Sequence, residues 1–341
     1  MNTQDKIEGG AYPFYVRSST IERANKYTYD GIAILTPGDG AIGKVFHYSE
    51  GKIAVHQRVY ILSDITIGTK YLFYYFADKF YNRVIRMSAK NTVDSVRMNM
   101  ITDMPISLPS LAEQEKIAGF LSLIDERIES CSETIKEIKT LKAGLLSLRV
   151  YQADKQYVPL SYFGEMKHGY PFKSTSYDED GTHRIVTISN VSGARYADMS
   201  KCNYLAELPH DIQQHQILSR NDILISLTGN VGRVSFCLAD GDLLNQRVGV
   251  LSLCDEAYKE YIYQVLSDWR FEMSMVACGQ GAAQLNISKS NVEGYLVPYE
   301  QSEYQEIGNF FSLLDDRIEI EEELLKQYEM QKKYLLRQMF I

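Results

Sequence analysis

The chain contains one long sequence module twice. Residues 120–129, FLSLIDERIE, return as residues 310–319, FFSLLDDRIE, at an offset of 190 residues. Landmarks upstream follow at an offset of 189: residues 43–45, GKV, fall on 232–234, GRV, and residues 57–59, QRV, fall on 246–248, QRV. A repeat of this length is a duplicated domain and not a short solenoid unit. The chain must therefore fold as one architecture used twice.

Between these landmarks the two copies differ at most positions. A shared frame with different intervening residues predicts one scaffold that carries two different surfaces. Two surfaces on one scaffold imply two different targets.

Length and composition fit two globular domains. A chain of 341 residues suffices for two domains of ~150 residues that each bury a core, and a hydrophobic content of 45% excludes a disordered chain. The apolar runs are far shorter than the ~20 residues of a membrane span, and residues 1–6, MNTQDK, lack a signal-peptide pattern. Five scattered cysteines contain no Cys-x-x-Cys pair, so they favour neither a zinc site nor a disulfide framework. We expect a cytoplasmic protein with no membrane partner.

The net charge of −8 is distributed unevenly. Residues 1–109 carry +3 and residues 110–150 carry −1, whereas residues 151–298 and 299–341 carry −5 each. The first domain is mildly basic, which permits a local phosphate-binding patch but predicts weak binding of nucleic acid by this chain alone.

Two long helices are predicted, over residues 110–150 and 299–341, because apolar residues recur there at alternating steps of three and four. Lys142, Glu321 and Lys332 interrupt this pattern. A helix of ~40 residues is ~60 Å long, more than one domain of this size can cover, so we expect the two apolar seams to pair antiparallel. The alternative is that each seam packs on its own domain. The predicted seam consists of Ile117, Leu121, Ile124, Ile128, Ile135, Ile138, Leu145, Ile307, Phe311, Leu314, Ile318, Leu325 and Leu335.

The remaining segments, 1–109 and 151–298, have the composition of mixed domains. Strands are expected at residues 32–35, 44–48, 59–62, 223–227 and 248–251, and helices at 71–88 and 260–277. The predicted class is α+β, with two tandem-duplicated α/β domains that are each followed by a long helix.

Residues 38–44, GDGAIGK, match G-x-G-x-x-G and nearly match a P-loop. Val45 stands where a P-loop needs Ser or Thr, and a dinucleotide site needs the last glycines to open a helix, whereas residues 44–48 are predicted as a strand. The run therefore indicates a hairpin turn. Motifs of metalloproteases, serine hydrolases and amino-methyltransferases are absent, and the histidines have no metal-ligand spacing. We expect no catalytic residue and no metal site.

Two variable domains, each ending in the repeated helix, resemble the specificity subunit of type I restriction-modification systems. In the first half the resemblance rests on residues 12–18, 35–40 and 56–60; in the second half it rests on residues 227–232, 245–248 and 284–287. It covers nearly the whole chain. The implied domains are a first target-recognition domain at 1–109, a central conserved helix at 110–150, a second target-recognition domain at 151–298 and a C-terminal conserved helix at 299–341.

The resemblance implies a non-catalytic protein that reads double-stranded DNA. Each domain of such a subunit recognises one half of a bipartite, asymmetric site, and the paired helices set the unread spacer. The helices also dock modification subunits, which methylate adenine N6, and a restriction motor subunit cuts the DNA. The implied S-adenosylmethionine, ATP and Mg belong to those partners, so no cofactor is expected in this chain.

Candidate DNA-binding residues fall into two groups. Residues common to both halves cannot encode two different half-sites, so they are expected to support the fold or contact phosphate. Unshared polar residues near them are the candidates for contacts with base edges. The shared candidates are Lys44, Gln57, Arg58, Arg233, Gln246 and Arg247; the unshared candidates are Arg17, Ser18, Arg23, His56, Thr228, Asn230, Gln284 and Asn286.

The second domain has about 25 residues, 157–181, ahead of the segment that aligns with residues 10–12. We therefore expect the first domain to be N-terminally abbreviated, either by truncation or by recombination between specificity genes. Three other functions stay open. A stand-alone DNA-binding protein would need no methylase, a coiled-coil adaptor would need no variable domains, and a nucleotide-dependent enzyme would be stabilised by ATP.

Overall fold

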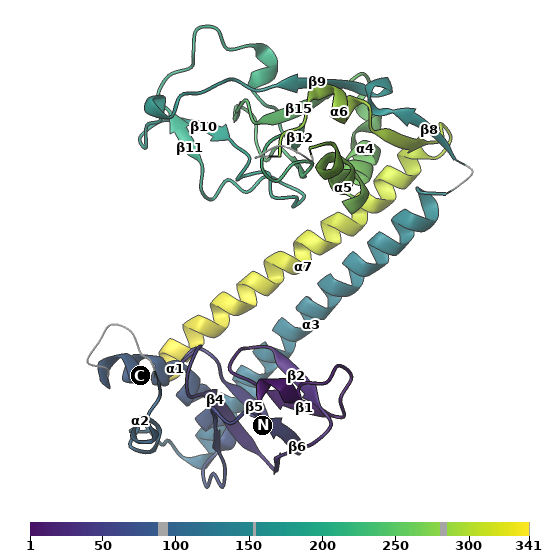
Figure 1. Ribbon diagram of the computed structural model, residues 1–341. Helices are drawn as coiled ribbons and strands as arrows, with labels where there is room; N and C mark the ends of the chain where they lie inside the picture. Colours follow the sequence, from purple (N-terminus) through teal and green to yellow (C-terminus); the bar gives the residue numbers. More distant parts are fainter. Residues whose placement is uncertain (88–94, 153–154, 280–284, 341) are drawn as a thin grey trace. The chain divides into compact units, whose positions relative to one another are not determined.

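The computed structural model describes residues 1–87, 95–152, 155–279 and 285–340, and it divides into two compact units. Unit 1 comprises Met1–Glu133 with Glu322–Ile341, and unit 2 comprises Thr134–Glu321. The long helices α3 (Leu111–Arg149) and α7 (Tyr304–Met339) each contribute one segment to each unit (Figure 1). Each unit is thus a mixed domain with a pair of helical segments. The prediction of an α+β protein with two tandem domains and long helices is confirmed.

Two small sheets lie in the described part of unit 1. One has the order β2-β1-β6-β3, in which β1 and β6 are parallel, and the other is the antiparallel sheet β5-β4-β7. The elements are β1 (Tyr12–Tyr15), β2 (Ile21–Ala24), β3 (Tyr29–Asp30), β4 (Ala33–Pro37), β5 (His47–Ser49), β6 (Lys52–Val55), β7 (Val59–Leu62), α1 (Thr69–Met87) and α2 (Met98–Thr102), with a 3-10 turn at Thr3–Asp5.

The residues of unit 2 that the structure describes form three sheets, with the orders β11-β10-β14, β13-β12-β15-β9 and β16-β8. Its elements are β8 (Gln156–Pro159), β9 (Gly164–His168), β10 (His183–Val186), β11 (Asn203–Leu205), β12 (Ile223–Ser226), β13 (Val234–Phe236), β14 (Leu243–Leu244), β15 (Val248–Leu253), α4 (Lys259–Leu266), α5 (Trp269–Cys278), α6 (Lys289–Glu293) and β16 (Leu296–Tyr299), with 3-10 turns at Leu160–Tyr162, Ser174–Ser176, Gln214–Gln216 and Glu256–Tyr258.

The duplication extends to strand register. Ile34 pairs with Leu62 between β4 and β7, and the residues 189 positions later, Ile223 and Leu251, pair between β12 and β15. The parallel pair β1–β6 likewise has its counterpart in the parallel pair β10–β14. Because a one-residue slip would turn every side chain to the other face, matched registers mean matched inner and outer faces. The two domains share one frame.

Two of the repeated glycines are required by this frame. Gly43 and Gly232 have φ angles of +64° and +79°, in the left-handed region that favours glycine. A Cβ at Gly43 would lie 3.0 Å from Cα of Tyr81 on α1, and one at Gly232 would lie 2.8 Å from Cβ of Met275 on α5. The turn before β5 or β13 therefore packs directly on a helix in both units.

Two sequence predictions of local structure were wrong in detail. The helix expected at 260–277 is broken into α4 and α5, because Asp268 takes an extended conformation and its carboxylate accepts a hydrogen bond from the Arg270 N–H. The strand expected at 44–48 starts only at His47, because the left-handed Gly43 extends the turn through Lys44.

The helical segments pair within each unit. In unit 1, Leu121 of α3 shares a core cluster with Leu335 and Met339 of α7. In unit 2, Leu146 of α3 shares a cluster with Phe311 of α7. The start of α3 thus lies against the end of α7, and the end of α3 against the start of α7, which is the predicted antiparallel arrangement. All residues of the predicted seam are buried or half-buried.

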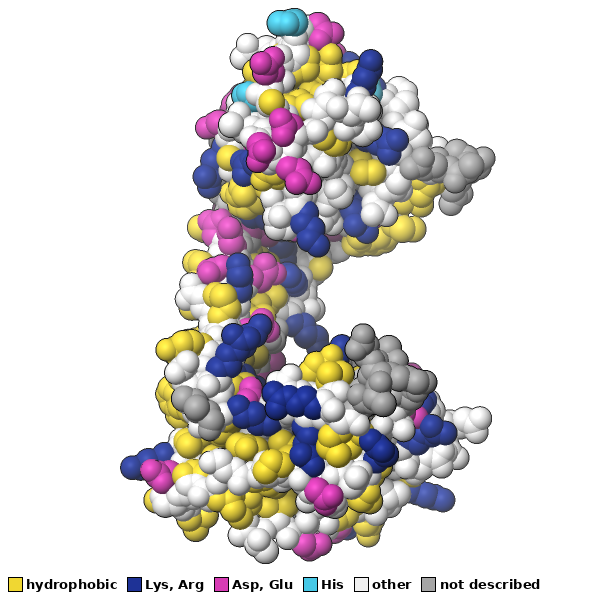
Figure 2. All heavy atoms as spheres, turned by 90° about the vertical axis from the view of Figure 1, so that its left-hand side faces the viewer, with side chains coloured by type: hydrophobic (Ala, Val, Ile, Leu, Met, Phe, Trp, Pro, Cys, Tyr) yellow, Lys and Arg dark blue, Asp and Glu magenta, His cyan; other side chains and the backbone are white. Residues whose placement is uncertain are grey.

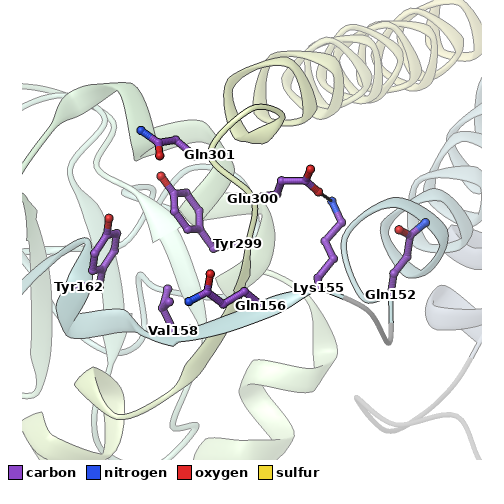
Figure 3. Close-up of a pocket in the computed structure, with 8 residues that line it drawn as sticks. All are labelled: Gln152, Lys155, Gln156, Val158, Tyr162, Tyr299, Glu300 and Gln301. Atoms are coloured by element: carbon purple, nitrogen blue, oxygen red, sulfur yellow. Dashed lines mark ion pairs between the residues drawn. The ribbon is translucent and has the colours of Figure 1, made fainter.

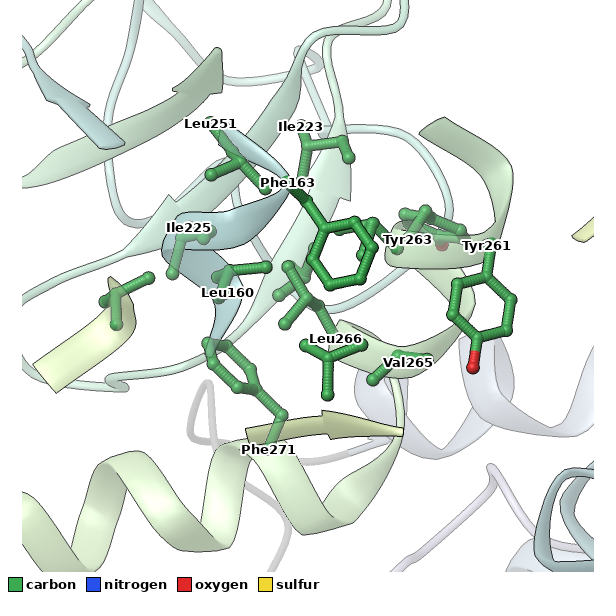
Figure 4. Close-up of a cluster of buried hydrophobic side chains, with 14 of the residues drawn as sticks. Leu160, Phe163, Ile223, Ile225, Leu251, Tyr261, Tyr263, Val265, Leu266 and Phe271 are labelled. Carbon is green, nitrogen blue, oxygen red and sulfur yellow. The ribbon is translucent and has the colours of Figure 1, made fainter. Parts of the chain in front are cut away.

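The main core of unit 2 lies between the sheet of β12 and β15 and the helices α4 and α5. Figure 4 shows Phe163 among side chains of both layers, with Ile223 and Leu251 from the strands and Tyr263 and Leu266 from α4. Phe163 is fully buried. At roughly 1.5–3 kcal/mol for each fully buried large apolar side chain, this cluster is a principal source of the stability of unit 2.

Residues 156–168 of unit 2 include two strands, β8 and β9. β8 pairs with β16, and β9 pairs with β15. Among the described residues of unit 1, no strand occupies the corresponding position beside β7. None of the helices in the described part of the chain combines the length and apolarity that crossing a membrane requires.

Candidate functional site

A surface hollow of about 740 Å³ in unit 2 collects four of the sequence-predicted residues. Thr228 comes from the turn after β12, Gln246 and Arg247 from the turn before β15, and Asn286 from the segment before α6. The side-chain hydroxyl of Thr228 donates to Oδ1 of Asn286 at 3.0 Å. These residues lie far apart in sequence, and the sheet brings them to one edge.

Unit 1 has a hollow of about 310 Å³ at the equivalent place. It is lined by Gly38, Asp39, Gln57 and Arg58, which correspond at the offset of 189 to Leu227, Thr228, Gln246 and Arg247 of the hollow in unit 2. The two hollows are therefore the same site of the shared frame. We call them hollow 1, in unit 1, and hollow 2, in unit 2.

The same turn presents the shared Gln-Arg pair in both hollows, as Gln57-Arg58 in hollow 1 and as Gln246-Arg247 in hollow 2. In unit 1, Nδ1 of His56 accepts a hydrogen bond from the Arg58 N–H at 3.1 Å; in unit 2, Oδ1 of Asn245 accepts from the Arg247 N–H at the same distance. His56 and Asn245 are both only 5% exposed. His56, a candidate base-contacting residue, is thus buried and holds the turn. Burial lowers its pKa, with further lowering by nearby Arg17.

The two hollows differ in their polar groups. In hollow 1 the carboxylate of Asp39 pairs with Arg58 at 2.6 Å and with Arg17 at 3.3 Å. Burial acts to raise the pKa of Asp39, but the guanidinium groups of Arg58 and Arg17 outweigh it and hold that pKa below its ordinary value. In hollow 2 the uncharged Thr228 stands in place of Asp39.

This difference decides whether the shared arginine, Arg58 or Arg247, has an ionic partner. Arg58 is tied to Asp39, whereas the exposed guanidinium of Arg247 has no ionic or hydrogen-bonding partner among the described residues. Arg247 is free to bind an anion. Arg58 can do so only by sharing or leaving Asp39.

The other candidates divide into three cases. The guanidinium of Arg23 donates to the carbonyls of Gly10 and Ala11, so it closes the start of β1. Ser18 and Asn230 are exposed in loops. Gln284 lies outside the described residues.

Lys44 and Arg233, the shared basic pair, lie against the helix that follows the sheet. Nζ of Lys44 stands 5.6 Å from the ring centroid of Tyr81 on α1, and Arg233 contacts Glu272 on α5 at 3.5 Å. Both side chains thus help to hold the turn of Gly43 or Gly232 on its helix.

Sequence reasoning missed Asp39, the centre of hollow 1. The signal was present, because Asp39 falls on Thr228 at the offset of 189 and Thr228 was a candidate. It also missed Lys289, which lines hollow 2 and pairs with Glu165 and Glu293.

A third hollow, of about 500 Å³, lies in unit 2 where the chain leaves α3 and enters α7. Figure 3 shows Lys155 directed at Glu300, with Tyr162 and Tyr299 on the opposite side. Lys155 pairs with Glu300 at 3.3 Å and Glu303 at 2.8 Å, so its charge is compensated within the fold. No group of His, Cys, Asp and Glu in the described parts of the chain could hold a metal ion.

The helices keep apolar side chains on the surface away from the seam. Phe120 and Leu123 of α3 are 43% and 59% exposed, and their repeats on α7, Phe310 and Leu313, are 46% and 67% exposed. Figure 2 shows hydrophobic side chains at the surface of the helical part, together with Lys and Arg side chains gathered on the part that unit 1 forms. We call Phe120 and Leu123 patch 1, and we call Phe310 and Leu313 patch 2. The same exposed apolar pair thus recurs on both helices at the repeat offset.

Comparison with known proteins gives a consistent result. The family model described as "Type I restriction modification DNA specificity domain" matches residues 1–140 and again residues 153–330. The EcoDI specificity subunit of Escherichia coli is 28% identical over 38% of this chain and 28% of its own length. The MjaVIII specificity subunit of Methanocaldococcus jannaschii is 23% identical over 96% of this chain and 84% of its own.

Solved structures agree on the fold. The S subunit of a type I restriction-modification system from M. genitalium superimposes with a TM-score of 0.67 at 17% identity, covering 100% of this chain and 91% of that chain. A chain from a study of complex assembly in the type I system gives a TM-score of 0.54 at 13% identity, covering 96% and 91%.

Proposed function

Because the chain belongs to the type I restriction modification DNA specificity family, we propose that it is the DNA-reading subunit of a type I complex. In this proposal each unit recognises one half of a bipartite, asymmetric sequence. The paired helices span the bases that are not read. Partner subunits then methylate adenine N6 and restrict unmodified DNA.

The observation that carries the proposal is the pair of equivalent hollows on one frame. A shared Gln-Arg pair and its turn serve both units, while Asp39 in one unit is replaced by Thr228 in the other. Shared cations suit phosphate, which is the same at every position of DNA. The unshared groups suit base edges, because a carboxylate accepts from the cytosine N4 amine, whereas hydroxyl and amide groups form other pairs.

In unit 2 we assign Arg247 to the DNA backbone and the Thr228–Asn286 pair to a base edge. In unit 1 we assign Asp39 to base selection, with Arg17 and Arg58 held in position by its carboxylate. DNA phosphates that approach these arginines would compete for them. In this proposal the base selectivity of unit 1 depends on whether Arg17 and Arg58 stay paired with Asp39 or bind DNA phosphates instead.

We propose that patches 1 and 2 each dock one modification subunit. The two patches carry the same residues at the same point of the repeat, so two copies of one partner can bind through the same contact. S-adenosylmethionine belongs to that partner in this proposal, and ATP and Mg belong to the restriction motor subunit. We propose no catalytic step in this chain itself.

The test is to co-express the chain with the modification subunit encoded beside it, in a methylation-free host, and to map N6-methyladenine across the genome. One asymmetric motif with two fixed halves and a constant gap is expected. Assembly without any methylation would contradict DNA reading by this pair of units. Absence of assembly would favour a stand-alone DNA-binding protein.

A matched pair of variants tests the docking surface. Leu123→Glu together with Leu313→Glu places charges in both patches and is expected to abolish co-purification of the modification subunit. The control pair, Glu129→Lys and Glu319→Lys, changes exposed charges at equivalent positions of the same helices and should leave co-purification intact. Equal loss in both pairs would argue against the apolar patches as the contact.

A further inference from the structure

In each unit an ion pair joins the two helical segments, and the two ion pairs use the same two positions of the repeat. In unit 2, Nζ of Lys142 lies 2.5 Å from Oδ1 of Asp315. In unit 1, Lys332 pairs with Asp125. Lys142 and Lys332 correspond at the offset of 190, as do Asp125 and Asp315. The two lysines are among the three polar residues that interrupt the apolar seam.

Each aspartate also binds the domain of its own unit. The Tyr74 hydroxyl on α1 donates to Oδ2 of Asp125 at 2.8 Å. In unit 2, Nε2 of Gln264 on α4 donates to Oδ2 of Asp315 at 2.7 Å. Tyr74 and Gln264 are again 190 residues apart, so the contact is repeated although the residue type is not. One carboxylate thus joins both helical segments and the recognition domain.

Unit 2 adds a further tie to the same carboxylate. Nη1 of Arg195, from the loop after β10, lies 2.9 Å from Oδ2 of Asp315. The guanidinium also contacts Glu260 on α4 and the Ser312 hydroxyl on α7. The side chain of Asp315 is only 9% exposed and that of Arg195 is 14% exposed.

These charges are not explained by stability alone. Lys142 and Asp315 are 15% and 9% exposed, and replacing such a buried ion pair with well-packed apolar residues is often neutral or stabilising. Lys332 and Asp125 are 29% and 34% exposed, and an ion pair at that exposure adds little stability. A polar residue in a coiled-coil seam does, however, specify its register. Aspartate and lysine are 17 residues apart on each helix, so a single antiparallel register satisfies both ion pairs. A slip by one heptad in one direction would instead set the aspartates opposite Leu325 and Ile135.

We propose that Asp125 and Asp315 are positioning residues. Each fixes the register of the helical pair and seats the recognition domain of its unit on that pair. Together they set the number of unread base pairs between the two half-sites. This inference rests on the proposed function and assigns the spacing to particular side chains.

The test uses the complete chain with its modification subunit and maps the methylated motif. Lys332→Asp places two carboxylates together and is expected to lower methylation at the native spacing at least tenfold, with sites of other spacings appearing. Combining it with Asp125→Lys reverses the ion pair and is expected to restore the single native spacing. Lys333→Asp, at the neighbouring exposed position, is the matched control and should not change the spacing.

The outcomes separate the two proposals. A wild-type chain without a bipartite motif would overturn the proposed function itself. If the wild-type chain methylates a bipartite motif and the Lys332→Asp variant methylates the same motif with the same spacing and frequency, the positioning role alone would be overturned. Helix content from circular dichroism is measured for each variant, and a folded reversed pair that fails to restore the spacing would overturn the assignment of the register to this ion pair.

Discussion

The turn that presents Arg58 depends on His56, and this dependence can be tested against the second unit. His56 accepts from the Arg58 N–H through Nδ1, and Asn245 does the same for Arg247 through Oδ1, both at 3.1 Å. His56→Ala removes the acceptor and leaves a poorly solvated N–H, which costs about 1–3 kcal/mol. His56→Asn copies the arrangement of unit 2 and should recover most of that loss.

The same variant should change the pH dependence of unit 1. Burial, helped by the nearby Arg17, lowers the pKa of His56 in the folded state below its value in the unfolded chain. The neutral ring is therefore favoured by folding. Its contribution to stability is fully present above about pH 6.5 and is lost as the pH falls through the lowered folded pKa. His56→Asn removes this titration.

The assay must report on unit 1 specifically. The single tryptophan, Trp269, belongs to unit 2, so fluorescence would report on that unit. Hydrogen exchange of residues 53–62, corrected for the intrinsic effect of pH, gives the opening free energy around β6 and β7. We expect wild type to lose protection between pH 7.5 and 5 more steeply than His56→Asn. A His56→Asn variant as unstable as His56→Ala, or one with an unchanged pH slope, would refute the reasoning.

Further predictions concern the hollows and the frame. Arg247→Ala should weaken binding to all DNA sequences alike and reduce the slope of log K against log salt by about 1, measured by titration at several salt concentrations. Asn230→Ala should instead cost about 1–3 kcal/mol on the cognate half-site only; equal loss on random DNA would exclude base contact. Asp39→Asn should change the methylated motif in one half and leave the other half as it was. Gly232→Ala, which meets a helix at positive φ, should cost roughly 2–4 kcal/mol in urea denaturation, against about 1–2 for Gly241→Ala, where φ is also positive but the space is open.

The long-range features of the fold could be predicted because they leave periodic or repeated patterns. The apolar spacing of the seam identified both long helices and their pairing, since a stripe of that length needs a partner of equal length. Buried strands such as β4 and β12 were visible as short apolar runs. The helix break at Asp268 was missed because a capping aspartate inside an apolar segment resembles an ordinary surface residue until its backbone conformation is known.

The candidate site could be predicted only in part. The shared Gln-Arg pair was found through the repeat, and the structure places it in both hollows. The burial of His56 could not be predicted, because histidine occurs both buried and exposed and its role here depends on a hydrogen bond from a backbone N–H two residues away. Asp39 was missed because an acidic residue does not suggest DNA binding until its two arginine partners are seen.

The pattern of what the two units share separates the frame from the selectivity. Asp125 and Asp315 are the same residue type with the same kind of contacts, and they join helical segments and line neither hollow. Asp39 and Thr228 differ, and they face the hollows without contributing to the helical seam. Because contacts that share no partner act nearly independently, exchanging residues in a hollow should change which bases are read without changing the gap between them. Conversely, altering the helical ion pairs should change the gap and leave both half-sites as they were.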